Sequence, residues 1–221
     1  RSVEDETLEN GTPFTFTVTP NEGHKISAVK VNGVVVTADT EGKYSAVVNG
    51  NTVITVETLK EGETEPQSVV KLTFPDENSS SNGKSGYQAT WTAKKGNYEW
   101  TVYGFNNNTW NNSWTYIRCG SKSNAYVATI STATAMTEAI SKVVVTIDKV
   151  TAANVNSIKL IVATNADFTE GVSEIALSSI ITGDVAFNIS NPQGNCYYKI
   201  AFDCKKASNG FLQVSAIDYL A

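Results

Sequence analysis

The chain has few of the residues on which many catalytic sites depend. Its 221 residues include one histidine, three cysteines and one methionine. A Ser-His-Asp or Cys-His arrangement needs a histidine beside its nucleophile, and the only one, His24, lies in a predicted turn near the start of the chain. A glycosidase needs only two carboxylates, but Glu99 is the one acid beside the aromatic residues and has no evident partner. We therefore expect no enzymatic activity.

The chain also lacks long apolar runs and clusters of basic residues. Its formal net charge is −5 and its pI is about 5.0. Nucleic-acid binding depends on clustered Lys and Arg, whereas the nearest approach here is a pair, Lys94-Lys95 or Lys205-Lys206. No segment approaches the ~20 apolar residues that span a bilayer, and no signal peptide is recognisable. We expect no nucleic-acid partner and no transmembrane segment, and the absence of Met at position 1 is typical of a processed or shortened chain.

The cysteines do not form a disulfide framework, because their number is odd and their spacing wide. Cys196 and Cys204 fall on one predicted strand, where eight residues at ~3.3 Å each place them too far apart to bridge. Cys119 can pair with one of them only if their strands are neighbours. We expect buried free thiols, with a single bridge as the alternative.

What the chain has in abundance is Thr, Ser, Asn and Val, a composition that favours strands and turns. Residues 1–60 alternate polar and apolar positions in a series of predicted hairpins, one of them at Asn32-Gly33, a strong hairpin signal. Residues 61–68 are acidic and have no apolar periodicity, which predicts a linker. The sequence thus predicts an all-β chain with a small first domain.

The segments FTVTPNEGHKISAVKVNGVVV and GKYSAVVNGNTVITVE resemble the internalin B-type repeat of bacterial surface proteins, also found in Bacteroides. The resemblance covers about residues 10–60. It implies a small β-grasp-like or Ig-like spacer domain at a cell surface, and a packing role for His24.

Residues 69–221 carry about nine short predicted strands separated by turn residues, a pattern typical of a β-sandwich or jelly roll. The stretch from Phe168 to Ile181 is compatible with either a helical turn or an edge strand. The segments FNNNTWNNSWTYIRCG, AISKVVVTIDKV, VNSIKLIVAT and the C-terminal CYYKIAFDC resemble an accessory module of secreted Bacteroidales proteins, similar in plan to galactose-binding-like jelly rolls. The resemblance implies an extracellular or outer-surface binding module.

All four tryptophans fall between Trp91 and Trp114. Strand alternation places Tyr98, Trp100 and Val102 on one face and Glu99, Tyr103 and Phe105 on the other. Because both faces cannot be solvent-exposed, we expect Trp91 and Trp100 in the core. The other two tryptophans adjoin an asparagine-rich run that is too polar for a buried strand.

Flat rings beside neutral amides suit sugar binding, since rings stack on sugar faces and amides bond hydroxyls. The candidate site for a neutral polysaccharide or host glycan is Trp110 and Trp114, with Asn107, Asn108, Asn111 and Asn112, and with Tyr87 and Tyr116 as second choices. The alternative is structural: Trp110 folds back as a lid on the sandwich.

Asp76 follows the first strand of the second domain and Asp218 lies in the last strand. Both offer hard oxygen ligands of the kind that calcium prefers, so they are candidates for a structural calcium, the one cofactor considered. Alternatively, Asp76 begins a turn and Asp218 faces solvent.

The sequence thus favours a non-catalytic module of a bacterial surface or secreted protein that binds glycan. Two alternatives remain at this stage: a purely structural stalk, and contacts with other surface proteins through an edge strand.

Overall fold

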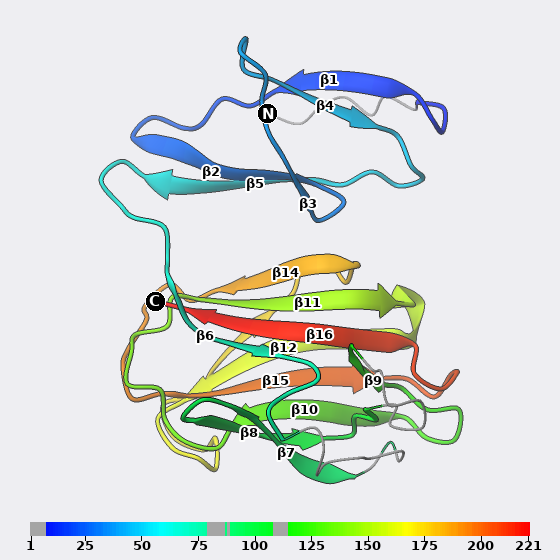
Figure 1. The fold of residues 1–221 in the computed structure, drawn as a ribbon, viewed down its shortest axis with the longest axis vertical. Coiled ribbons are helices and arrows are strands. Elements are labelled where there is room, and N and C mark those ends of the chain that lie inside the picture. Colours follow the sequence, from blue (N-terminus) through cyan, green and yellow to red (C-terminus); the bar gives the residue numbers. More distant parts are fainter. Residues whose placement is uncertain (1–7, 79–86, 88, 108–114) are drawn as a thin grey trace. The chain divides into compact units, whose positions relative to one another are not determined.

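The computed structural model describes residues 8–78, 87, 89–107 and 115–221. The chain divides into two compact units, Arg1–Glu65 and Pro66–Ala221. The division falls within the segment predicted as a linker, between strand β5 (Ile54–Lys60) and strand β6 (Ser68–Thr73). Both units are built from β-strands (Figure 1), as the alternating sequence predicts, and the chain is all-β. No helix in the described part is long and apolar enough to cross a membrane.

The smaller unit contains two antiparallel sheets. One pairs β1 (Pro13–Thr17) with β4 (Lys43–Val47), and the other has the order β3-β2-β5, with β2 at His24–Val31 and β3 at Val34–Val36. The predicted turn between β2 and β3 is confirmed: Asn32 and Gly33 have φ angles of 50° and 81°, the positive values that a type I′ turn requires.

The expectation of successive hairpins is otherwise wrong for this unit. Among its described strands only β2 and β3 are consecutive partners. The rings explain the pairing of β1 with β4, because Phe16 stacks on Phe14 and on Tyr44, with centroids 5.8 and 5.4 Å apart. Burying these rings together requires two strands that are distant in the sequence.

The larger unit is a β-sandwich of two antiparallel sheets (Figure 1). The six-stranded sheet has the order β13-β12-β15-β10-β8-β7, and the other has the order β14-β11-β16-β6 with β9 added beside β16. Their remaining bounds are β7 Thr90–Lys95, β8 Tyr98–Tyr103, β9 Ile117–Cys119, β10 Tyr126–Thr132, β11 Lys142–Val150, β12 Val155–Ala163, β13 Ser173–Ala176, β14 Gly183–Asn188, β15 Tyr197–Cys204 and β16 Leu212–Leu220. A short 3-10 helix, Ala152–Asn154, links β11 to β12. The ambiguous stretch after Phe168 contains the edge strand β13.

The core of the sandwich lies between the sheets and is rich in aromatic rings. Trp91 and Trp100 are buried, with 4% and 0% of their surface exposed, which confirms their predicted place in the core. Each indole N–H has an acceptor: Trp91 donates to the Phe105 carbonyl and Trp100 to the Tyr219 hydroxyl, both at 3.1 Å. A buried indole needs such a partner.

Strand alternation was a correct guide within β8 but failed just beyond it. Phe105, placed by alternation on the face opposite Trp100 with Glu99 and Tyr103, is fully buried. It follows Gly104, whose φ of 79° interrupts the alternation. Its ring then packs edge-on against Phe202, with centroids 5.3 Å apart.

Candidate binding site at one end of the larger unit

Three of the eight predicted glycan-binding residues belong to the described part of the chain: Tyr87, Asn107 and Tyr116. The others, Asn108, Trp110, Asn111, Asn112 and Trp114, lie outside it. Tyr87 precedes β7, Asn107 follows β8, and Tyr116 precedes β9. The two tyrosines are half-buried.

The asparagine run, which includes the predicted hydroxyl partner Asn107, begins inside the protein. Asn106 and Asn107 both have no exposed surface. The backbone of Asn106 exchanges two 2.8 Å hydrogen bonds with Arg118, forming an isolated bridge to β9. This pairing draws the start of the run against the sandwich.

The loops near these residues form one end of the sandwich. We call it the loop end and define it as Tyr87 with segments 104–107, 115–125, 151–154 and 205–211. Segment 120–125 lies along segment 205–211: the amides of Ala207 and Gly210 donate to the carbonyls of Ser121 and Gly120, each at 3.0 Å. The Lys122 amide also donates to the Asn209 side chain at 2.9 Å. Segment 151–154 joins the same end, because the Lys205 amide bonds to the Asn154 carbonyl at 2.9 Å.

Arg118 occupies the centre of the loop end, on the middle residue of β9. It lies beside Tyr87: burial raises the pKa of the Tyr87 phenol, while the Arg118 charge and a hydrogen bond from its guanidinium oppose that rise. Tyr116 is close enough to contribute to the same pKa. An arginine beside a half-buried phenol combines a fixed fork of donors with a flat apolar face.

Gly210 leaves the space that this arrangement needs. A Cβ at Gly210 would lie 2.7 Å from Cδ of Arg118 and 3.1 Å from the Tyr87 hydroxyl. Any side chain there would displace one of them. Glycine therefore allows the arginine and the tyrosine to approach the loop backbone.

Tyr126 joins the loop end to the strands beneath it. Its hydroxyl accepts from the Gly120 amide at 2.9 Å and donates to the Gly104 carbonyl at 2.8 Å. Burial is the main reason why the pKa of Tyr126 is strongly raised, so it remains neutral and can serve both roles. This residue holds two loops in register, and the sequence gives no signal for it beyond an aromatic at a strand start.

The basic residues of the loop end were also missed. Arg118, Lys122, Lys205 and Lys206 are scattered over 89 positions (118–206) of the sequence and form no run. Of these four residues only Lys205 and Lys206 are consecutive in the sequence. The backbone bridge between Ser121 and Lys206 brings the separate charges to one place.

The two proposed calcium ligands have separate partners. Asp76 is buried, with 6% of its surface exposed, and its Oδ2 accepts from the amides of Asn78 and Lys94 at 3.0 and 2.9 Å. Asp218 lies opposite Lys71 in β6 and accepts from the Ser68 hydroxyl at 2.5 Å. Within the described residues no group of three or more His, Cys, Asp or Glu is placed to hold a metal ion.

His24 lies in the smaller unit, apart from the loop end. It begins β2, and its Nδ1 is 3.1 Å from the Glu22 carbonyl oxygen. The contact is local and exposed, and no nucleophile is involved in it.

No family model matches the chain, and no curated protein matches it. A solved structure described as "Structural basis for the promiscuous specificity of the carbohydrate-binding modules from the beta-sandwich super family" is similar at 14% identity, with a TM-score of 0.38. The alignment covers 96% of this chain and 93% of that chain. No residue role is carried over from it.

Proposed function

We propose that the larger unit is a non-catalytic carbohydrate-binding module whose site is the loop end around Tyr87, Tyr116 and Arg118. The observation that carries the proposal is the contact of Arg118 with the half-buried Tyr87 phenol, on the backbone cradle left by Gly210. Phenol faces suit the apolar faces of a sugar ring, and the guanidinium offers several directed N–H donors. Ligand sites commonly combine aromatic surface with a few placed polar groups in this way.

The rigidity of the surrounding loops supports a binding role. Lys122 and Asn209, Gly120 and Gly210, and Tyr126 and Gly104 are all joined by hydrogen bonds of 2.8–3.0 Å. A site whose loops are already ordered loses less conformational entropy when it binds a ligand.

The absence of a histidine from residues 66–221 supports a non-catalytic role. Asp76, Asp148 and Asp203 lie outside the loop end, and its described segments contain no Asp or Glu. A pair of carboxylates for glycoside hydrolysis is therefore missing from those segments.

The test is binding of the full chain to a panel of soluble polysaccharides, measured by affinity electrophoresis and by tryptophan fluorescence. Tyr116→Ala should weaken binding at least about tenfold, or ~1.4 kcal/mol, with little change in thermal stability because the ring is half-buried. Tyr197→Ala is the matched control, since this half-buried tyrosine begins β15 at the opposite end of the sandwich. Equal binding by wild type, Tyr87→Ala and Tyr116→Ala would rule out this site.

Trp110 and Trp114 stay predictions from the sequence. If Trp110 is a stacking platform, Trp110→Ala abolishes the fluorescence response and leaves the melting temperature nearly unchanged. If it is a lid, the same substitution lowers stability by the amount expected for a lost buried ring, about 3–5 kcal/mol.

For the smaller unit we propose a spacer role at a bacterial surface, in keeping with the repeat resemblance. A role in protein contacts is the second candidate, favoured by exposed apolar side chains: Val34, Val35 and Val47 are 68%, 59% and 55% exposed. Val34 and Val47 line an open hollow together with Asn10, Asn32 and Asn49. Light scattering of the full chain distinguishes the two roles. Self-association that Val35→Lys abolishes favours protein contacts, whereas a monomer at all concentrations favours a simple spacer.

A further inference from the structure

The loop end carries positive charge on a protein that is acidic as a whole. The chain has 22 Asp and Glu against 17 Lys and Arg. The described segments of the loop end contain Arg118, Lys122, Lys205 and Lys206 and no acidic residue at all. Residues 66–221 contain 12 Lys and Arg against 11 Asp and Glu, a nearly even balance, so the loop end differs from the rest of its unit in carrying bases only.

Contacts between the loops show that these charges are neighbours. Lys122 is tied through its amide to Asn209, the residue before Gly210, and Gly210 touches Arg118. Lys206 forms a backbone bridge with Ser121, the residue before Lys122. Lys122 and Lys206 therefore belong to adjoining stretches of backbone, residues 120–122 and 206–210, and Arg118 lies against the second stretch at Gly210.

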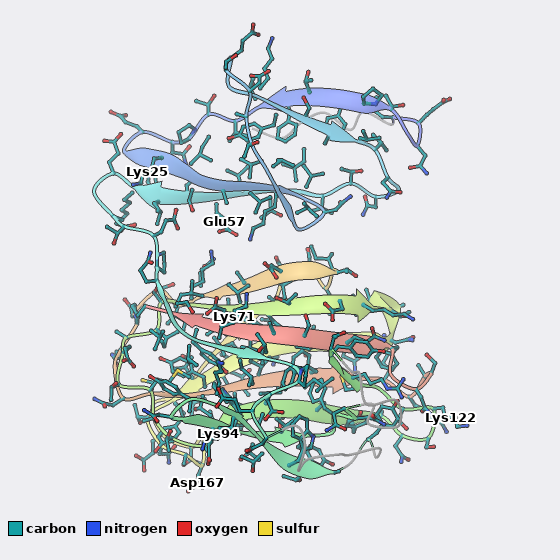
Figure 2. The ribbon with its side chains drawn as sticks, viewed as in Figure 1. Lys25, Glu57, Lys71, Lys94, Lys122 and Asp167 are labelled. Carbon is teal, nitrogen blue, oxygen red and sulfur yellow. The ribbon has the colours of Figure 1, made fainter. Side chains whose placement is uncertain are left out.

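Two of the charges are exposed, and the part of the chain that the structure describes supplies no carboxylate partner for them. Lys122 and Lys206 are exposed, and neither takes part in an ion pair with a described residue. Figure 2 shows Lys122 at the periphery of the larger unit. Lys205 differs, since its ammonium donates to the Ala153 carbonyl at 2.8 Å.

The nearest carboxylates on the adjoining strands have other partners. Asp148, near the end of β11, accepts from the Ser215 hydroxyl at 2.8 Å. Asp203, near the end of β15, accepts from the Asn156 amide at 3.2 Å. Neither forms an ion pair with the lysines of the loop end among the described residues.

From this placement we propose that the loop end binds an acidic glycan, a polysaccharide that carries carboxylate or sulfate groups. The inference rests on the proposed function and narrows its substrate class, replacing the neutral sugar expected from the asparagine run. Arg118 pairs with the anionic group in the forked geometry that suits carboxylate and sulfate. Lys122 and Lys206 attract further charges along the polymer, and Tyr87 and Tyr116 contact the sugar rings.

The same charges fit a nucleic acid poorly. Nucleic-acid-binding domains are typically strongly basic, with pI above about 9, whereas residues 66–221 have 12 Lys and Arg against 11 Asp and Glu. Tight phosphate-backbone binding commonly involves about 6–10 contacts, and the loop end offers two free lysines and one arginine. A sparse set of charges beside aromatic rings matches a polymer with one charge per sugar ring.

The experiment compares polygalacturonate with its fully methyl-esterified form, which has the same sugar backbone but uncharged methyl esters in place of carboxylates. Wild type should bind polygalacturonate at least about tenfold more tightly than the ester at low salt, and sodium chloride at about 0.5 M should remove most of that difference. Dextran sulfate against dextran repeats the comparison for sulfate and separates the two anionic groups. Single-stranded DNA and anionic phospholipid vesicles complete the panel.

Lys122→Glu combined with Lys206→Glu should reduce polygalacturonate binding by at least tenfold and leave binding of the ester unchanged. The control is Lys25→Glu with Lys60→Glu, which changes the net charge equally but lies on the smaller unit. If the control pair weakens binding as much as the loop pair, net charge is responsible and the inference is overturned.

The outcomes distinguish this inference from the proposed function. If wild type binds polygalacturonate and its ester equally and Tyr116→Ala binds neither, the preference for acidic glycans is overturned. The glycan-binding site at the loop end is then still supported. Binding of DNA or vesicles as tight as binding of polygalacturonate, unaffected by Tyr116→Ala, overturns both. No binding of any polysaccharide also overturns both.

Discussion

The thiols of Cys119 and Cys204 lie 3.6 Å apart although their strands belong to different sheets. Cys119 ends β9 beside β16, and Cys204 ends β15 in the six-stranded sheet. The two strands are not paired in one sheet, and their thiols meet because side chains of two stacked sheets interdigitate. All three cysteines are buried free thiols, as expected.

This burial predicts the order in which the thiols react. Burial raises the pKa of Cys119 well above its usual value and also raises that of Cys196, so the reactive thiolate is scarce at both. Cys196 retains 4% exposure, whereas Cys119 and Cys204 have none. Iodoacetamide at mildly alkaline pH should label Cys196 first, with Cys119 and Cys204 labelled only after unfolding in urea, as followed by peptide mass spectrometry. Rapid labelling of Cys119 in the folded chain would contradict the buried arrangement.

The hydrogen bond from Trp100 to Tyr219 connects the two sheets through the core. Tyr219→Phe removes the acceptor and leaves a buried indole N–H unpaired, which should cost about 1–3 kcal/mol in the free energy of unfolding. Trp100→Phe should cost about 3 kcal/mol, because it also leaves a cavity. Urea unfolding of the two single variants and the double variant gives the interaction free energy between Trp100 and Tyr219, which we expect to be near 1 kcal/mol. Tyr197→Phe, at a half-buried position, should change stability by less than about 0.5 kcal/mol.

Buried phenols make the fold sensitive to high pH. Burial is the main cause that raises the pKa of Tyr198 to about 12, from a usual value of 10.0, and it also strongly raises the pKa of Tyr219. The folded state therefore holds these protons more tightly than the unfolded state, so the stabilisation is complete below pH 10 and is lost as pH rises toward the folded pKa. The urea midpoint should fall gradually above about pH 8.5, where the thiols of the unfolded chain ionise, and more steeply above pH 10, where its phenols ionise. In Tyr198→Phe part of that fall should disappear, and an unchanged pH profile would assign the effect to other groups.

Alanine substitutions at two glycines, Gly210 at the loop end and Gly96 outside it, distinguish an effect on glycan binding from an effect on stability. Gly210 and Gly96 have nearly equal φ angles, 63° and 58°, but a Cβ at Gly96 meets no atom within 4 Å, whereas one at Gly210 meets Arg118. Alanine should therefore cost both positions a similar backbone strain, about 1 kcal/mol. Only Gly210→Ala should also weaken polygalacturonate binding, because it moves Arg118. Equal binding by the two variants in affinity electrophoresis would show that the position of Arg118 is unimportant.

Much of the local structure follows from the sequence alone. The alternation of apolar residues located the strands of the sandwich, and the Asn-Gly pair at position 32 specified its turn. Alternation also placed Trp91 and Trp100 in the core, because strand side chains point alternately to the two faces. These features depend on residues within a few positions of one another.

The tertiary structure decided what depends on distant pairings. The stacking of Phe16 on Tyr44 selects β4 as the partner of β1, and one left-handed residue, Gly104, turns Phe105 inward. The burial of Asn107 and the meeting of Arg118 with Gly210 follow from the bridge to β9 and from hydrogen bonds between loops. Sequence patterns identify which side chains must be buried, but the surface charge at one end of a sandwich depends on which loops the folded sheets bring together.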